Sequence, residues 1–81
     1  MKQERITQAT QFDGKNLQDI FDLPCVVSIH KWPEPYATIL GGAIAIAQNA
    51  HVGDWICQIE RDDITYWTVM VNKVYQRKQH P

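Results

Sequence analysis

The stretch Asn49-Ala50-His51-Val52-Gly53-Asp54-Trp55-Ile56-Cys57-Gln58-Ile59 joins a turn directly to an apolar strand, and it decides how the rest of the chain is arranged. Glycine reaches positive φ without a Cβ clash and aspartate bonds nearby backbone amides, so Gly53-Asp54 predicts a tight turn. Alternation along the strand places three residues on the face that we expect to be the core face: Trp55, Cys57 and Ile59. Ile56 breaks this pattern, because it is apolar and lies on the opposite face.

The composition indicates one small folded domain. Of the 81 residues, 44% are hydrophobic and 21% are charged, which is far from the composition of a disordered chain. A chain of this size buries only about 60–65% of its unfolded surface, so the core is small. The net charge of −1 provides no overall field that would attract nucleic acid or an anionic membrane.

Nothing in the sequence predicts export or membrane insertion. The polar opening Met1-Lys2-Gln3-Glu4-Arg5 contains no apolar segment of the kind found in signal peptides. The longest apolar run, Ala43 to Ala47, is far shorter than the roughly 20 residues that span a bilayer. We therefore expect a cytoplasmic protein.

The segment before Cys25 predicts a strand and a short helix. Residues 4 to 12 mix β-branched and polar residues and end at the turn Asp13-Gly14, which predicts a first strand. Asn16 is suited to cap a helix over residues 16 to 23, which Leu23-Pro24 terminates. The stripe on this helix should press against a sheet; it comprises Leu17, Ile20 and Phe21.

The next segment predicts a strand followed by a stiff loop. Cys25 to Lys31 is rich in β-branched residues, and Trp32-Pro33-Glu34-Pro35-Tyr36 ends it with two prolines. Two roles are open for the aromatic residues that flank the loop, Trp32 and Tyr36. They either cover the core or contact a binding partner.

The middle of the chain predicts a hairpin. Ala37 to Leu40 and Ala43 to Gln48 read as two strands, and Gly41-Gly42 suits a two-residue turn between them. A single strand bulged at the glycines is the alternative. The alanines of the second segment, with Ala45 at their centre, form a face that either packs against the short helix or pairs with a second copy of the chain.

The C-terminal part predicts a second hairpin. Arg61-Asp62-Asp63 marks a reversal before Ile64 to Val71, a run of high β propensity. Val74 to Arg77 is read as a further short strand, with a polar tail from about residue 77. Together these elements predict an α+β fold: a largely antiparallel sheet of five or six strands, curled or barrel-like, with one short helix after the first strand.

No arrangement of residues points to catalysis, a cofactor or a metal. His51, Asp54 and Cys57 lie three apart, but no further ligand pair supports a metal site. Cys57 has no orienting partner that would make it a nucleophile, and we expect both cysteines, Cys25 and Cys57, to be buried and unpaired. We therefore expect no enzymatic activity.

Three stretches resemble a family of short, uncharacterised proteins encoded by bacteriophages and prophages. Gln8 to Leu17 is similar to the family's opening strand and short helix, and Thr38 to Ala47 matches its glycine-alanine segment. Val52-Gly53-Asp54-Trp55-Ile56 resembles its "PGDWI" sequence, with Val52 in place of the proline. Val71 to Tyr75 stands where the family has a Phe-x-x-x-Tyr ending.

The chain departs from this family at a second place. Thr65-Tyr66-Trp67-Thr68 replaces a Tyr-Pro-Cys-Lys-Pro stretch, so no role of that cysteine or lysine carries over. The resemblance implies a phage-related cytoplasmic protein and brings no established activity with it.

For function we expect a non-enzymatic module that binds another protein, such as a host factor, and self-associates. The candidate interaction surface consists of Trp32, Tyr36, Ala45, Tyr66 and Trp67. The alternative is a nucleic-acid or nucleotide binder that stacks bases on Tyr66 and Trp67. It would use the basic C-terminal residues Lys73, Arg77, Lys78 and His80.

Overall fold

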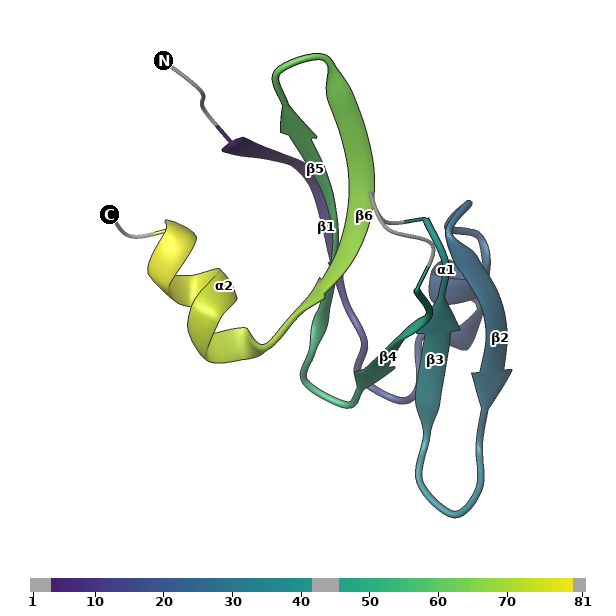
Figure 1. Cartoon of the computed structure of the whole chain (residues 1–81). Coiled ribbons are helices and arrows are strands. Elements are labelled where there is room, and N and C mark those ends of the chain that lie inside the picture. The colour runs from purple at the N-terminus through teal and green to yellow at the C-terminus, as the bar shows by residue number, and fades with distance from the viewer. Residues whose placement is uncertain (1–3, 42–45, 80–81) are drawn as a thin grey trace.

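The computed structural model describes residues 4–41 and 46–79. It contains six strands and two helices in these parts of the chain (Figure 1). In chain order they are β1 (Glu4–Gln11), α1 (Leu17–Phe21), β2 (Val26–His30), β3 (Tyr36–Ile39), β4 (Gln48–His51), β5 (Trp55–Arg61), β6 (Ile64–Met70) and α2 (Asn72–Gln79). No helix in the described ranges has the length and apolarity needed to cross a membrane.

The strands form two antiparallel sheets of three strands each. The first sheet has the order β1-β5-β6 and the second sheet the order β2-β3-β4. The α+β class is therefore confirmed, but the single five- or six-stranded, barrel-like sheet is wrong, and neither sheet closes on itself. In Figure 1 the two sheets lie side by side, with α1 behind the second sheet and α2 on the far side of the first.

The two sheets remain separate because β6 finds other hydrogen-bond partners along its outer edge. The backbone N–H of Trp67 donates to the carbonyl oxygen of Gly41 at 3.0 Å. The N–H of Val69 donates to Oε1 of the Gln48 side chain at 2.9 Å, and the Thr68 hydroxyl donates to the same oxygen at 3.1 Å. A loop carbonyl and a side-chain amide thus stand where the backbone of a fourth strand would be.

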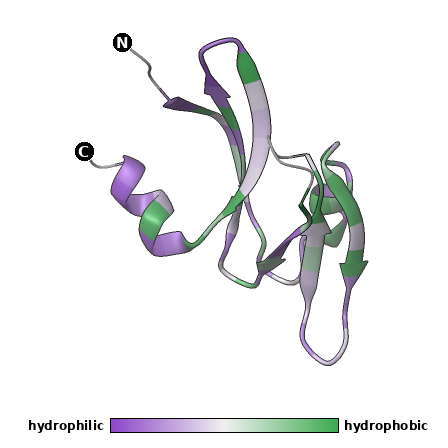
Figure 2. Cartoon of the chain, in the orientation of Figure 1, coloured by the Kyte–Doolittle hydropathy of each residue, from purple (hydrophilic) through white to green (hydrophobic). Residues whose placement is uncertain are grey.

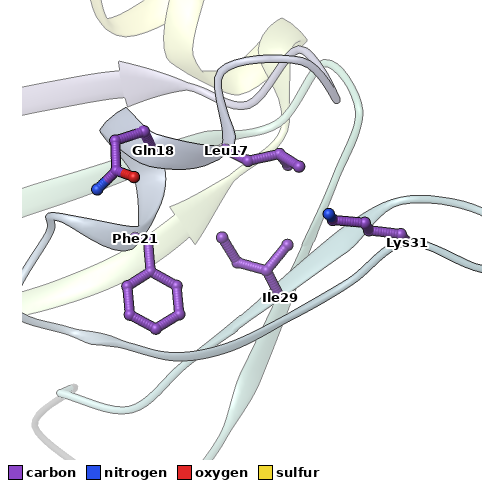
Figure 3. A pocket seen from close by; sticks show the side chains of 5 residues that line it. All are labelled: Leu17, Gln18, Phe21, Ile29 and Lys31. Carbon is purple, nitrogen blue, oxygen red and sulfur yellow. The ribbon is translucent and has the colours of Figure 1, made fainter.

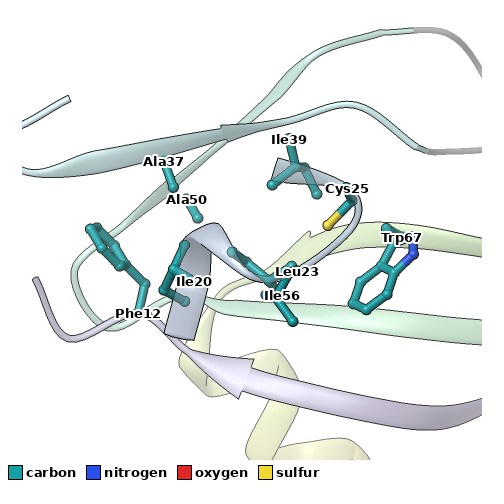
Figure 4. Packing of buried hydrophobic residues seen from close by; sticks show 9 residues of the cluster. All are labelled: Phe12, Ile20, Leu23, Cys25, Ala37, Ile39, Ala50, Ile56 and Trp67. Atoms are coloured by element: carbon teal, nitrogen blue, oxygen red, sulfur yellow. The ribbon is translucent and has the colours of Figure 1, made fainter. Parts of the chain in front are cut away.

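Two hydrophobic cores lie on opposite faces of the first sheet. The main core fills the space between the sheets and α1 (Figure 4); its buried residues are Phe12, Ile20, Leu23, Cys25, Ala37, Ile39, Ala50, Ile56 and Trp67. The second core is smaller and consists of Cys57, Ile59 and Met70, with Ile6, Ala9, Trp55, Tyr66 and Tyr75 packed against it. Each face of the first sheet is therefore apolar.

This division corrects the predicted face of β5. Cys57 and Ile59 are buried as expected, but they belong to the second core, whereas Ile56 is fully buried in the main core. Trp55 is only partly buried, at the rim of the second core. A central strand that is covered on both faces needs apolar residues on both, and Ile56 is the residue that meets this need on the main-core side.

Helix α1 is shorter than predicted, and one residue of its stripe faces away from the core. Ile20 is fully buried and Leu17 packs against the main core, but Phe21 is 58% exposed. Asn16 does not cap the helix with its side chain. It instead donates from Nδ2 to the carbonyl of Gln11 and accepts the N–H of Asp13, so it ties the end of β1 to the turn.

Two predicted turns are confirmed, and both depend on positive φ. Gly53 has φ +99°, and its N–H donates to the carbonyl of Phe12 at 2.8 Å, so the turn also anchors the chain that follows β1. Asp62 has φ +56° in the two-residue loop between β5 and β6. Both reversals are of the kind that glycine and aspartate accept more readily than other residues.

The predicted hairpin around Gly41-Gly42 is wrong in detail. Strands β3 and β4 do pair antiparallel, with Ile39 opposite Gln48, but the connection spans residues 40–47 rather than two glycines. Strand β4 begins at Gln48, where the predicted strand ended. Residues 42–45, which include Ala45 and most of the alanine face, lie outside the described residues.

Residues 72–79 form a helix, so the further short strand predicted for Val74 to Arg77 is wrong. Helix α2 runs from Asn72 to Gln79, and no residue in it is buried. It is predominantly hydrophilic (Figure 2), and its sequence contains only one aliphatic and one aromatic residue, Val74 and Tyr75. Tyr75 fastens it to the first sheet, because its ring stacks on Trp55 at 3.8 Å between centroids with an interplanar angle of 13°.

Replacing Ile56 tests the two-sided burial of β5. We expect Ile56→Ala to lower the free energy of unfolding by about 2–5 kcal/mol, because it leaves a cavity in the main core. Ile64→Ala is the matched control: this residue is 58% exposed, and the change should stay within about 0.5 kcal/mol. Urea unfolding followed by tryptophan fluorescence measures both, and equal effects would contradict this assignment of Ile56.

Replacing Gly53 tests the backbone of the central turn. A Cβ added at this glycine would have no neighbour within 4 Å, so a substitution costs only backbone strain. We expect Gly53→Ala to destabilise the fold by about 1–2 kcal/mol and Gly53→Asn by less, since asparagine enters the left-handed region more readily. The same unfolding measurement serves here, and an alanine variant as stable as the parent would refute the turn geometry.

Candidate functional site

The outer face of the second sheet carries a group of polar and aromatic side chains. Ala37 and Ala50 are fully buried on its inner face, so their neighbours along each strand point outward. We define the outer face by the six residues that share this orientation: Ser28, His30, Tyr36, Thr38, Asn49 and His51. It lies on the opposite side of the second sheet from the main core.

Three rings form a row across this face. The register places His30 opposite Tyr36 and Tyr36 opposite His51. The His30 and Tyr36 rings are stacked, with centroids 4.4 Å apart and an interplanar angle of 13°. The Tyr36 and His51 rings are 5.8 Å apart and tilted by 32°. We call these three residues the ring row; cross-strand aromatic pairs of this kind hold one another in place.

Hydrogen bonds fix the orientation of the remaining polar groups. The Thr38 hydroxyl donates to Oδ1 of Asn49 at 2.9 Å, and Oγ of Ser28 lies 3.1 Å from Nε2 of His30. Oδ2 of Asp54 accepts the backbone N–H of His51 at 2.9 Å and lies 3.9 Å from its Nδ1. The outer face is thus ordered by contacts within the protein.

Trp32 extends this surface beyond the end of the sheet. It stands in the loop between β2 and β3, two residues after His30, and is 86% exposed. It therefore does not cover the core, which removes one of the two roles left open for it. Tyr36 is partly buried, but by its stacking against the histidine rings on the outer face. Of the predicted interaction residues, Trp32 and Tyr36 both belong to the connection between β2 and β3, Trp32 within the loop and Tyr36 as the first residue of β3.

Tyr66 and Trp67 do not form a joint surface. Trp67 is 8% exposed and belongs to the main core, whereas Tyr66 lies on the other face of β6 against the second core. The Tyr66 hydroxyl donates to Oε2 of Glu4 at 3.4 Å. Partial burial, followed by the negative charge of Glu4, raises the pKa of this tyrosine. The predicted base-stacking pair is therefore wrong, because neighbouring residues of a strand face opposite sides of a sheet.

The basic C-terminal residues also lie apart from the outer face. Lys73, Arg77 and Lys78 are in α2, beside the first sheet (Figure 1). Nζ of Lys78 lies 3.5 Å from Oε1 of Glu4, so one of these charges is paired within the protein. The ring row and the basic residues consequently do not form one continuous surface.

Sequence reasoning missed several contacts that the register creates. His30 and His51 are 21 positions apart in the chain and meet only through Tyr36, and no local pattern identifies them as neighbours. Asn72 was likewise missed: its Oδ1 accepts the indole N–H of Trp55 at 2.9 Å. The aromatic residues on strand ends were the available signal, since they are suited to cross-strand stacking.

The cysteines are buried, and they lie in different cores. Both thiols are unpaired: Cys25 packs in the main core and Cys57 in the second core. Burial raises the pKa of each thiol to about 11, so both are protonated near neutral pH and unsuited to nucleophilic attack or metal binding. Within residues 4–41 and 46–79, no group of three or more His, Cys, Asp or Glu side chains is placed to hold a metal.

A separate hollow lies between α1 and the outer edge of the second sheet. Its volume is about 270 Å³, and it is lined by Leu17, Gln18, Phe21, Ile29 and Lys31 (Figure 3). Leu17, Phe21 and Ile29 make its walls apolar, while the Lys31 side chain reaches along one end. The hollow lies beside β2 on the side of the second sheet that faces α1, because Ile29 is opposite the inward-facing Ala37.

Compared with known protein families, curated proteins and solved structures, the chain shows no match.

Raising the pH tests the burial of the thiols. The pKa of each cysteine is raised from 9.0 to about 11 in the folded state, so the folded protein keeps protons that the unfolded chain releases. Their contribution to stability is therefore fully present below about pH 9 and is lost as the pH rises from 9 to 11. We expect the urea midpoint to fall between about pH 8 and pH 10.5. Cys25→Ala should show a smaller fall, and a decrease as large as that of the parent would contradict the assignment.

Proposed function

We propose that this protein is a non-enzymatic protein-binding module whose binding surface is Trp32 together with the ring row. The observation that carries the proposal is the 86% exposure of Trp32, two residues after His30, whose ring stacks on Tyr36. An indole left in water is costly unless a partner covers it, and tryptophan and tyrosine are enriched among residues that dominate binding energy.

The order of the outer face supports the same proposal. The ring row is held by stacking, and the side chains of Thr38 and Asn49 are held by a hydrogen bond to each other. Side chains that are already fixed lose little conformational entropy when a partner binds. Trp32 then supplies the apolar anchor, and the polar groups around it supply hydrogen bonds at the rim.

The resemblance noted for Val52-Gly53-Asp54-Trp55-Ile56 supports a phage-related accessory role. On this proposal the protein acts in the cytoplasm of a bacterial host, and a host protein is its partner. Self-association is a further part of the proposal. No cofactor and no catalytic step is needed for such a role.

Nucleic-acid binding remains the alternative, and the ring row is the observation that favours it. Exposed rings on a sheet face are surfaces on which unpaired bases stack. The charge argues for protein instead, because the net charge is −1 and the basic residues of α2 flank the other sheet.

Affinity capture from a bacterial lysate distinguishes these functions. The immobilised protein should retain a specific protein, and this retention should survive nuclease treatment and decrease at least about tenfold for Trp32→Ala. Because Trp32 makes little contact with the core, this variant should fold like the parent.

Ile64→Ala is the matched control, since Ile64 is an exposed apolar residue on the hairpin of the first sheet. Its capture should equal that of the parent. Retention that disappears after nuclease treatment would favour the nucleic-acid alternative, and retention that is indifferent to Trp32→Ala would exclude the proposed surface.

A further inference from the structure

The four outer edges of the two sheets differ in how they are protected. The edge of β6 is covered by the carbonyl of Gly41 and the side chain of Gln48. The edge of β4 faces β6, because Gln48 belongs to β4 and spans the gap. Within the described ranges, no strand pairs with the outer edge of any of the four edge strands, and β1 and β2 are the two that show no such cover.

Strand β1 carries the features that discourage pairing with another chain. Its register with β5 shifts between Ile6 and Gln8, so the strand is bulged. Glu4 and Arg5 place charges at its start, and Arg5 is paired with Glu60 at 2.8 Å. Bulges and charged residues are the usual protection of an exposed edge.

Strand β2 has such a bulge, like β1, but carries no glutamate, aspartate, lysine or arginine. Its sequence is Val26-Val27-Ser28-Ile29-His30, without proline, lysine or a carboxylate. A shift in its register with β3 lies at Val27, whose side chain is 57% exposed. Figure 2 shows β2 as one of the most hydrophobic strands at the surface of the molecule. An unpaired apolar edge of this kind favours the addition of a strand.

The surface beside β2 contains both an apolar recess and a projecting apolar side chain. Leu17 and Ile29 form its walls, and Phe21 stands at its side with 58% of its surface exposed (Figure 3). One copy of the chain thus presents an exposed phenyl ring and an apolar recess next to the same strand. A twofold contact requires such self-complementarity, since each copy uses the same surface.

The charges around the hollow are also self-complementary, because each copy carries one basic and one acidic residue there. Lys31 follows β2 at one end of the hollow, and the exposed Asp22 follows Phe21 at the end of α1. Within the described ranges, no carboxylate lies in salt-bridge distance of Lys31. Antiparallel pairing of two β2 strands turns one copy end for end, so it brings Lys31 of each copy towards Asp22 of the other.

We infer that the occupant of this edge is a second copy of the chain. Strand β2 pairs antiparallel with β2 of the second copy, and Phe21 of each copy packs over the hollow of the other. The two second sheets then form one six-stranded sheet with two ring rows on its outer face. This inference rests on the self-association included in the proposed function and names its surface, while a partner can bind the outer face of a single copy.

Sedimentation of the whole chain at about 50 μM tests the inference. We expect a species of about 19 kDa, twice the 9.4 kDa of one chain. Phe21→Asp should raise the dissociation constant of the dimer at least about tenfold. Ile64→Asp is the control, because Ile64 has the same 58% exposure but lies on the distant β5–β6 hairpin, and it should leave the dimer intact.

A charge reversal tests the register of the two copies. Lys31→Asp should weaken the dimer, and adding Asp22→Lys should restore it, because the charges are exchanged between the copies. Circular dichroism confirms that each variant is folded. A monomeric parent, a dimer indifferent to Phe21→Asp, or a folded double variant that stays as weak as Lys31→Asp would each overturn the inference. Trp32→Ala should lose lysate capture but keep the dimer. Lysate capture therefore tests the proposed binding surface, and dimerisation tests this inference.

Discussion

Strand β5 has to bury both of its faces, and most of the fold follows from this requirement. Ile56 points into the main core, while Cys57 and Ile59 point into the second core. A strand of this kind needs a neighbour on each side and a cover on each face. Strands β1 and β6 are the neighbours, and α1 with the second sheet covers one face. Tyr75 of α2 contributes to the cover of the other, where it stacks on Trp55.

The sequence predicted the strands and turns better than their assembly, and particular residues show why. Gly53 and Asp62-Asp63 are local signals, since the required φ depends on the residue itself. The apolar Ile56, on the face opposite Cys57 and Ile59, indicated that both faces of this strand are buried. The sequence of a single strand does not show which elements cover each face. The segment Asn72–Gln79 has only Val74 and Tyr75 as apolar residues, too few to distinguish a strand from a helix.

The candidate site was predicted only in part, for a related reason. Trp32 and Tyr36 were identified because aromatic residues flank a proline loop, which is visible in the sequence. Their partners His30 and His51 come together through the β2–β3 and β3–β4 registers, which no local pattern encodes. Trp67 shows the reverse case: it resembles a surface aromatic residue in sequence, and the alternation of β6 places it in the main core.

The pairing of β1 with β5 also determines when the protein becomes complete during its synthesis. Gln11 lies opposite Trp55 and Glu4 opposite Arg61, so the whole second sheet is translated between the two partners. Strand β1 leaves the ribosome early and remains without its neighbour until β5 has followed. Since β5 is also the strand that both cores need, neither core closes before that point. A truncated chain that stops before β5 therefore exposes β1 and the second sheet's apolar face together, the combination that chaperones bind and proteases remove.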